Sequence, residues 1–204
     1  MNLYSYVVAY DSAFAPNPFY GYCTLCTCKP GIRKSANVGD WVVGTGSADK
    51  KVQMGGYLVH AMRVTEVLDL ADYWHDPRFQ KKKPSLYGSL MQASGDNIYE
   101  PQADSTWRQK DSYHSNPDGS DNPDHRRRDT AVPRVLVSTD FAYFGAEGPK
   151  LPDKFLEGGE FQICPVGRSY RRWRDPERIK EFEAWFRDQR RSGFQGKPRD
   201  WLGR

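Results

Sequence analysis

The chain has 204 residues and a formal net charge of +4, with 38% hydrophobic and 14% aromatic residues. Disordered chains are poor in aromatic residues, so this composition excludes a disordered protein and favours one folded domain over residues 1–204. No apolar stretch is long enough to cross a membrane, and the N-terminus lacks the pattern of a signal peptide. We therefore expect a cytoplasmic protein with reduced thiols and no membrane partner.

The N-terminal segment predicts a buried strand followed by an ordered loop. Residues Leu3–Tyr10 are rich in β-branched and aromatic side chains, which is typical of a strand. Pro16 and Pro18 exclude regular structure after it. Side chains on such a loop are candidates for contact with a ligand, here Phe14, Asn17 and Phe19. A short helix or turn is expected around Ile32–Ala36.

A strand interrupted by glycine follows. Asp40–Val43 predicts a buried strand, and the chain then runs into Gly-Thr-Gly-Ser. Glycine weakens a strand and often marks the close approach of a ligand or of another backbone, so we expect Thr45, Gly46 and Ser47 to face a ligand. Gly56–Leu68 is the clearest strand of the chain. The turn between the two strands predicts an antiparallel pair.

The rest of the chain predicts an insertion, more strands and a helix. Residues 72–132 have little periodicity but many aromatic side chains, which indicates an ordered, loop-rich insertion. Barrel strands are expected in 1–71 and 133–165, on either side of it. In 175–192, Pro176 and apolar residues at helical spacing predict a C-terminal helix. The predicted fold class is α+β, a small mixed or antiparallel β-barrel with peripheral helices.

Four cysteines are candidates for metal binding or catalysis. The spacing of Cys23, Cys26 and Cys28 is similar to zinc ligation, but Cys164 stands alone and no nearby residue completes a set of four ligands. A buried thiol in a core or pocket is the simpler interpretation. A catalytic cysteine paired with His114 or His60 is the alternative.

Several polar and aromatic residues of the insertion suit contact with a nucleotide. His114 in "DSYHS" could transfer a proton or bind a base, or it could belong to a loop capped by its own side chains. Asp96 and Asn97 in "GDNIY" could read the edge of a base or form a plain turn. Trp74 and Arg78 could stack on a base and hold a phosphate, or cover a loop.

The order of motifs carries a first resemblance. A Gly-Asp pair before an apolar strand, small polar residues after it, and a second strand over Leu58–Val67 resemble the PUA-like superfamily, especially its EVE and ASCH branches. This resemblance implies a barrel of PUA-like (EVE- or ASCH-like) type. It also implies that the loop at Thr45–Ser47 forms part of a pocket at the barrel mouth.

Nearly the whole chain resembles the second family of nucleotide-modification-associated domains. The segments that carry this resemblance include "VGDWVVGTGS", "AMRVTEVLDLADYWHDPRF", "GDNIY", "DSYHS" and "RDT", in this order. Members of that family occur in bacteria and phages beside genes that modify or restrict DNA. The resemblance therefore implies a context of DNA modification or phage defence, and it assigns no catalytic residue.

These observations lead first to the hypothesis of a binding module that recognises a modified base or nucleotide in DNA, with the base extruded into a pocket. The residues expected to line this pocket are Phe14, Asn17, Phe19, Trp41, Thr45, Gly46, Ser47, Trp74, Asp96, Asn97 and His114. The residues expected to contact phosphates are Lys29, Arg33, Arg78 and Arg128.

Two other functions are compatible with the same residues. The chain could be an enzyme that acts on a nucleotide or modified base, with His114, Asp96 or Cys23 as the catalytic group. It could instead sequester a free nucleotide signal. The expected partner in each case is DNA or a nucleotide with a modified base, and neither a metal nor a cofactor is predicted.

Overall fold

The computed structural model describes residues 1–156, 158–165 and 169–202, so Glu157 of the predicted strand region 133–165 lies outside the described residues. The chain forms two compact units. Unit 1 contains Met1–Asp11, Ala36–Thr65 and Ser138–Arg204, and unit 2 contains Ser12–Ser35 and Glu66–Val137. None of the helices in the described part of the chain has the length and apolar composition that a membrane crossing requires.

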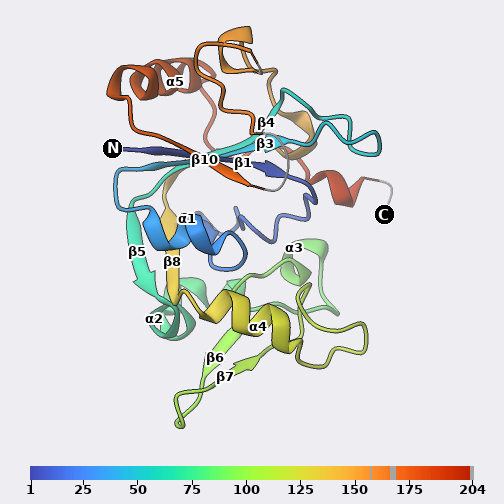
Figure 1. Ribbon diagram of the computed structural model, residues 1–204. Coiled ribbons are helices and arrows are strands. Elements are labelled where there is room, and N and C mark those ends of the chain that lie inside the picture. The colour runs from blue at the N-terminus through green and yellow to red at the C-terminus, as the bar shows by residue number, and fades with distance from the viewer. Residues whose placement is uncertain (157, 166–168, 203–204) are drawn as a thin grey trace. The chain divides into compact units, whose positions relative to one another are not determined.

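Unit 1 is built on a mixed sheet of six strands with the order β10-β1-β3-β4-β9-β11 (Figure 1). β1 and β3 are parallel, as are β9 and β11, whereas the other neighbours are antiparallel. The antiparallel pair predicted around residue 50 is thus confirmed as β3 and β4. The strands are β1 (Leu3–Val8), β3 (Trp41–Gly46), β4 (Leu58–Arg63), β9 (Asp140–Tyr143), β10 (Tyr170–Trp173) and β11 (Gly193–Phe194).

The α+β class is confirmed, but the predicted PUA-like barrel is not. A barrel closes when its first and last strands pair. In the described residues, β10 and β11 are the two edges of the sheet and each has one neighbouring strand. The sheet is open, and a helix covers one of its faces instead.

That helix is α5 (Pro176–Asp188), in the segment where the sequence predicts a C-terminal helix. The side chain of Asp175 accepts hydrogen bonds from two backbone N–H groups of the first turn, which explains where the helix begins. Its apolar face packs on the sheet, with the Trp41 ring centroid 5.8 Å from that of Phe182 and 5.2 Å from that of Phe186. Short 3-10 helices complete unit 1: η2 (Gly145–Glu147), η3 (Asp153–Phe155) and η4 (Arg199–Trp201).

The glycines of β3 are explained by packing inside unit 1. The prediction that this strand ends at Val43 is wrong, because β3 continues to Gly46. A Cβ on Gly44 would overlap the ring of His60, and one on Gly46 would overlap the backbone oxygen of Met54. Protein atoms therefore take up the space that the missing side chains leave open.

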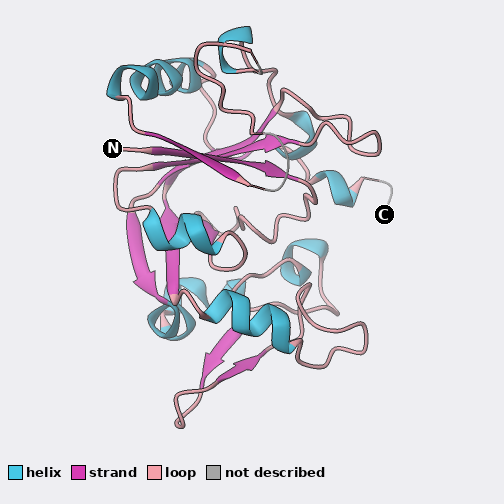
Figure 2. Cartoon of the chain, in the orientation of Figure 1, coloured by secondary structure: helices cyan, strands magenta, loops and turns pink. Residues whose placement is uncertain are grey.

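Unit 2 consists of short elements joined by long loops (pink in Figure 2). Three strands form one sheet in the order β2-β8-β5, and β6 pairs with β7. The strands are β2 (Cys23–Leu25), β5 (Glu66–Asp69), β6 (Tyr99–Pro101), β7 (Trp107–Gln109) and β8 (Arg134–Ser138). The helices are α1 (Pro30–Ser35), α2 (Leu70–His75), η1 (Pro77–Lys82), α3 (Leu90–Ala93) and α4 (Pro123–Thr130).

Two segments that are expected to form strands each contribute to two sheets. Gly56–Leu68 is not one strand, because β4 ends at Arg63 and β5 begins at Glu66 in another sheet. In Pro133–Gly145 the sequence predicts a strand pair or a strand and a turn, and the structure has two strands there, β8 and β9, which belong to different sheets. Polar residues stand at both breaks, Thr65 and Glu66 at the first and Ser138, Thr139 and Asp140 at the second. Polar residues also occur on the exposed face of a continuous strand, so hydrophobic pattern alone does not reveal where the chain changes sheets.

Candidate functional site

The site begins at Cys28, between β2 and α1. Cys28 and Lys29 have φ values of 58° and 38°, so the backbone takes the left-handed conformation at two successive non-glycine residues. The side chain of Cys28 is partly exposed, whereas Cys23 and Cys26 are buried. Strained backbone of this kind at a partly exposed thiol is a feature of functional sites.

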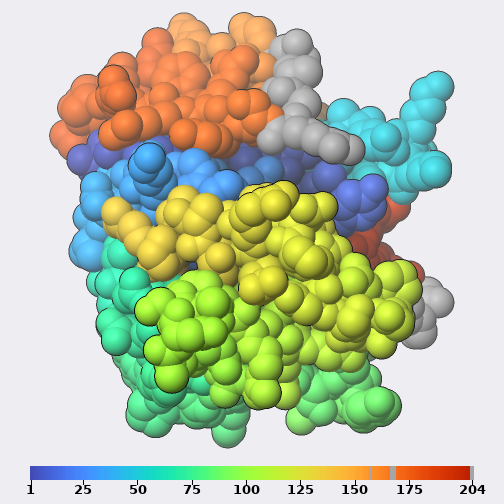
Figure 3. All heavy atoms as spheres, turned by 60° about the horizontal axis from the view of Figure 1, so that its bottom comes forward, coloured from blue at the N-terminus to red at the C-terminus, as the bar shows by residue number. Residues whose placement is uncertain are grey.

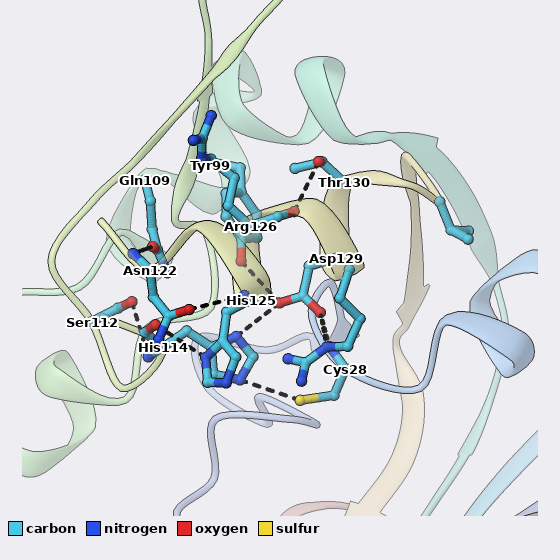
Figure 4. A network of polar contacts seen from close by, with 12 residues as sticks. Cys28, Tyr99, Gln109, Ser112, His114, Asn122, His125, Arg126, Asp129 and Thr130 are labelled. Carbon is cyan, nitrogen blue, oxygen red and sulfur yellow. Dashed lines mark hydrogen bonds and ion pairs between the residues drawn. The ribbon is translucent and has the colours of Figure 1, made fainter. Parts of the chain in front are cut away.

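His114 contacts this thiol. Its Nε2 atom lies 3.4 Å from Sγ of Cys28, and its Nδ1 atom lies 2.8 Å from Oδ2 of Asp129 (Figure 4). Phe14 packs against the ring at a centroid distance of 4.7 Å, and Ser112 Oγ accepts the backbone N–H of His114. One nitrogen of the imidazole thus contacts a thiol, and the other contacts a carboxylate.

Asp129, in the last turn of α4, has no solvent exposure. Its Oδ1 accepts the backbone N–H of Cys28 and Nε of Arg128, both at 3.1 Å. Its Oδ2 accepts the hydroxyl of Tyr99 at 2.9 Å in addition to His114. Burial by itself would raise the pKa of Asp129, but the hydrogen bond and charge of His114, with those of Arg128, lower it to about 2.

The carboxylate in turn keeps His114 protonated. Burial by itself would lower the pKa of His114, but hydrogen bonds to Asp129 and Cys28 outweigh burial and raise the pKa to about 9. At neutral pH an imidazolium therefore lies beside the sulfur. This order of thiol, imidazole and carboxylate is the one that activates cysteine nucleophiles.

Arg33 holds the backbone on both sides of the site. It is fully buried in α1, and its Nε donates to the carbonyl oxygen of Cys28 at 2.9 Å. Its Nη2 donates to the carbonyl oxygen of Asp129 at 2.8 Å, and its Nη1 donates to those of Val132 and Arg134. In the described structure this predicted phosphate ligand binds carbonyl groups of the protein.

Asp96 and Asn97 lie in a separate, buried polar cluster. Asp96 accepts hydroxyl groups from Thr24 and Tyr73, both at 2.7 Å, and Asn97 donates to the carbonyl oxygens of Tyr73 and Phe79. Burial raises the pKa of Asp96 to about 6. These contacts join distant segments of unit 2.

Lys82 belongs to the same cluster and holds the loop that contains Asn17. Its Nζ donates to the carbonyl oxygens of Asn17 and Tyr22 and to Oδ1 of Asn17, at 2.9, 3.0 and 2.6 Å. Asn17 is fully buried and donates to the carbonyl oxygens of Ala13 and Ser94. Burial lowers the pKa of Lys82 to about 8. Asn17, a predicted ligand contact, thus binds the ammonium group of Lys82.

The other predicted residues are spread over both units. In unit 1, Trp41, Thr45 and Gly46 are buried, and Ser47 Oγ accepts the N–H of Asp49 in a turn. In unit 2, the side chain of Phe19 is 2% exposed.

Two predicted ring and phosphate contacts in unit 2 have partners within the protein. Lys83 Nζ lies 3.7 Å from the ring centroid of Trp74. Arg78 forms ion pairs with Glu66 and Asp76. Of the predicted phosphate ligands, Lys29 and Arg128 are the two that adjoin the thiol and Asp129 in the chain.

Cys23, the predicted catalytic thiol, is fully buried, and burial raises its pKa to about 12. The sequence leaves open which cysteine pairs with His114 or His60, and the structure brings Cys28 to His114. No group of three or more His, Cys, Asp or Glu in the described residues is arranged to hold a metal. Asp129 forms an ion pair with its neighbour Arg128.

One signal in the sequence could have directed attention to Asp129. The segment "NPDHRRRD" begins with an Asn cap and a proline, which predicts a helix with His125 and Asp129 on one face. Nothing local points from either residue to Cys28.

Comparison with known protein families gives a match. The model of a family described as nucleotide modification associated domain 2 matches residues 1–204, the whole chain, which confirms the resemblance read from the sequence. No curated protein and no solved structure matches the chain.

Proposed function

The chain belongs to the nucleotide modification associated domain 2 family, and from this premise we propose that it is a thiol-dependent enzyme acting on a nucleotide or a modified base. One observation carries the proposal, the contact of His114 with both Cys28 and Asp129. A binding module needs no nucleophile beside an imidazolium. The residues in the catalytic role are Cys28, His114 and Asp129, with Cys28 in place of the buried Cys23.

The proposed first step forms a covalent intermediate. Cys28 attacks an electrophilic carbon of the substrate as the thiolate, and an S–C bond forms as the bond from that carbon to its leaving oxygen or nitrogen breaks. His114 gives its Nε2 proton to the leaving atom and becomes neutral. Asp129 stays ionised and fixes the orientation of the ring.

Charge near the thiol supports an anionic substrate such as a nucleotide. Lys29 is partly exposed and adjoins Cys28 in the chain. The Arg128 side chain is 42% exposed and uses Nε for Asp129, which leaves its outer nitrogens in position to bind a phosphate. We propose Lys29 and Arg128 as the phosphate contacts, and a modified base, in DNA or as a free nucleotide, as the group brought to Cys28.

Alkylation tests the activated thiol without knowledge of the substrate. Iodoacetamide at pH 7, with sites mapped by peptide mass spectrometry, is expected to label Cys28 at least about tenfold faster in the wild type than in His114→Asn, because the variant lacks the imidazolium. Cys164 is an internal control, since it is also partly buried but contacts Thr45 and Gly56. Equal labelling of Cys28 in both proteins would contradict the proposal.

A substrate screen separates the enzyme from a binding module. Oligonucleotides and free nucleotides with modified bases are incubated with wild type and Cys28→Ser, and products are identified by mass. A mass change that needs Cys28 supports the enzyme. Tight binding that is equal in the two proteins, with every nucleotide recovered unchanged, would establish a binding or sequestering function instead.

A further inference from the structure

We infer that His125 is a second catalytic residue of the proposed reaction, the base that accepts a proton from the water or other nucleophile that releases the product from Cys28. This inference rests on the proposed function and adds the group that completes its cycle. It follows from the tautomer of His125, from its place beside His114 and from its exposure.

A hydrogen bond fixes the tautomer of His125. Its Nδ1 atom lies 3.1 Å from the backbone oxygen of His114. A carbonyl oxygen only accepts hydrogen bonds, so Nδ1 carries the hydrogen and Nε2 of the neutral ring keeps a free lone pair. A base needs such a nitrogen.

The start of α4 places this ring beside the catalytic histidine. Oδ1 of Asn122 accepts the backbone N–H of His125 at 3.1 Å and caps the helix. His125 and Asp129 are four residues apart and thus share one face of α4. Asp129 binds the His114 ring through Nδ1, and the His125 ring lies 4.4 Å from it between centroids (Figure 4).

The surroundings of the two rings give them opposite proton affinities. Burial and the positive charges of His114 and Arg128 lower the pKa of His125, and the hydrogen bond to the His114 backbone and the charge of Asp129 oppose them only in part. His114 is protonated at a pH at which His125 is neutral. Two imidazoles of this kind supply an acid and a base at the same pH.

His125 is also accessible to a water molecule. Its side chain is partly exposed, whereas that of His114 is 9% exposed. α4 and the segment before it reach the surface of unit 2 (yellow and yellow-green in Figure 3). A nucleophile can therefore approach from solvent on the α4 side.

The inferred second step balances the first. Water attacks the carbon bound to sulfur while one of its protons passes to Nε2 of His125. A C–O bond forms, the C–S bond breaks, and the sulfur leaves as a thiolate. The proton on His125 then returns through solvent to His114, which restores the starting state.

The probe p-nitrophenyl acetate separates the two steps. The thiolate of Cys28 takes up the acetyl group, and p-nitrophenolate leaves as an anion without the proton of His114. The wild type is expected to show a burst of p-nitrophenolate followed by steady turnover. His125→Asn keeps a donor for the His114 carbonyl oxygen but has no base, so its burst remains and its steady rate falls about a hundredfold, as for loss of a general base.

The outcomes distinguish the two proposals. Accumulation of acetylated Cys28 in His125→Asn, detected by mass spectrometry, supports the inference. Unchanged burst and steady phases in this variant overturn it, as does a wild type that is acetylated once without turnover. If the wild type shows no burst, or shows a burst that Cys28→Ser does not abolish, the proposed function is overturned, and the inference with it. Circular dichroism checks that each variant is folded.

Discussion

Asp129 is ionised although water does not reach it, because donors surround both of its oxygens. Three of these donors come from side chains, those of Tyr99, His114 and Arg128, and the fourth is the backbone N–H of Cys28. The charge is therefore balanced within the protein, and it accounts for the raised pKa of His114. The electrostatics of the site thus depend on one residue.

Asp129→Asn tests this dependence. Loss of the carboxylate charge should lower the pKa of His114 from about 9 to its ordinary value of 6.5 or below. It should also destabilise the protein by about 3 kcal/mol, because a buried ion pair loses one partner. Imidazole NMR titration and urea unfolding measure the two effects.

Tyr99→Phe is the matched control for this prediction. It removes one neutral donor from Asp129, keeps the charge, and should cost about 1 kcal/mol with little change in the His114 titration. An unaltered His114 titration in Asp129→Asn would show that the carboxylate does not set the protonation of the ring.

At the scale of elements, Arg33 in α1 joins the segment that carries Cys28 to the end of α4 and the start of β8. A guanidinium donates in several fixed directions, which lets one side chain bind four carbonyl groups. The Cys28–His114 contact therefore depends on a residue that does not touch the sulfur itself. Arg33 is a positioning residue.

Arg33→Lys should weaken both the fold and the site. A lysine cannot donate in all the directions of the guanidinium, so buried carbonyl groups lose their donors. The free energy of unfolding should fall by roughly 3 kcal/mol. Alkylation of Cys28 by iodoacetamide, measured on the folded variant, should slow because the thiol moves relative to His114. Arg127→Lys, on the exposed face of α4, should change stability by less than about 0.5 kcal/mol. A wild-type alkylation rate in Arg33→Lys would limit Arg33 to a role in stability.

At the scale of the molecule, the chain is divided into two units, and unit 1 contains a buried histidine that makes its stability depend on pH. In unit 1, His60 is fully buried, its Nε2 lies 2.9 Å from the hydroxyl of Tyr6, and burial lowers its pKa to about 3. In the unfolded chain His60 binds a proton with the ordinary pKa of 6.5, whereas in the folded chain it binds that proton only at about pH 3. The contribution of neutral His60 is thus present above pH 6.5 and is lost as the pH falls toward 3.

His60→Gln should reduce this sensitivity to acid. The glutamine oxygen can still accept from Tyr6, but glutamine does not titrate. Between pH 6.5 and 5 the wild type should lose about 2 kcal/mol more than the variant. Urea unfolding at the two pH values measures the difference, and hydrogen exchange at β3 and β4 assigns it to unit 1. Equal acid losses in both proteins would count against a neutral buried His60.

The sequence by itself determined the family, the mixed α+β class, the β3–β4 pairing and His114 as a candidate site residue. The family follows from the order of motifs over nearly the whole chain. The other three follow from patterns within a few residues, such as alternation, caps and polar loops. The sequence could not show that residues 56–68 form strands in two different sheets, or that the sheet of unit 1 is open. It also could not show that the glycines of β3 leave room for His60 and Met54.

Only the tertiary structure paired Cys28 with His114, 86 residues away, and brought Asp129 to both. Local periodicity records which face of an element is apolar. It carries no information on which distant side chains meet, because that depends on how the loops of unit 2 pack and on the buried contacts of Arg33 and Lys82. The chemistry of this site therefore became visible only with the fold.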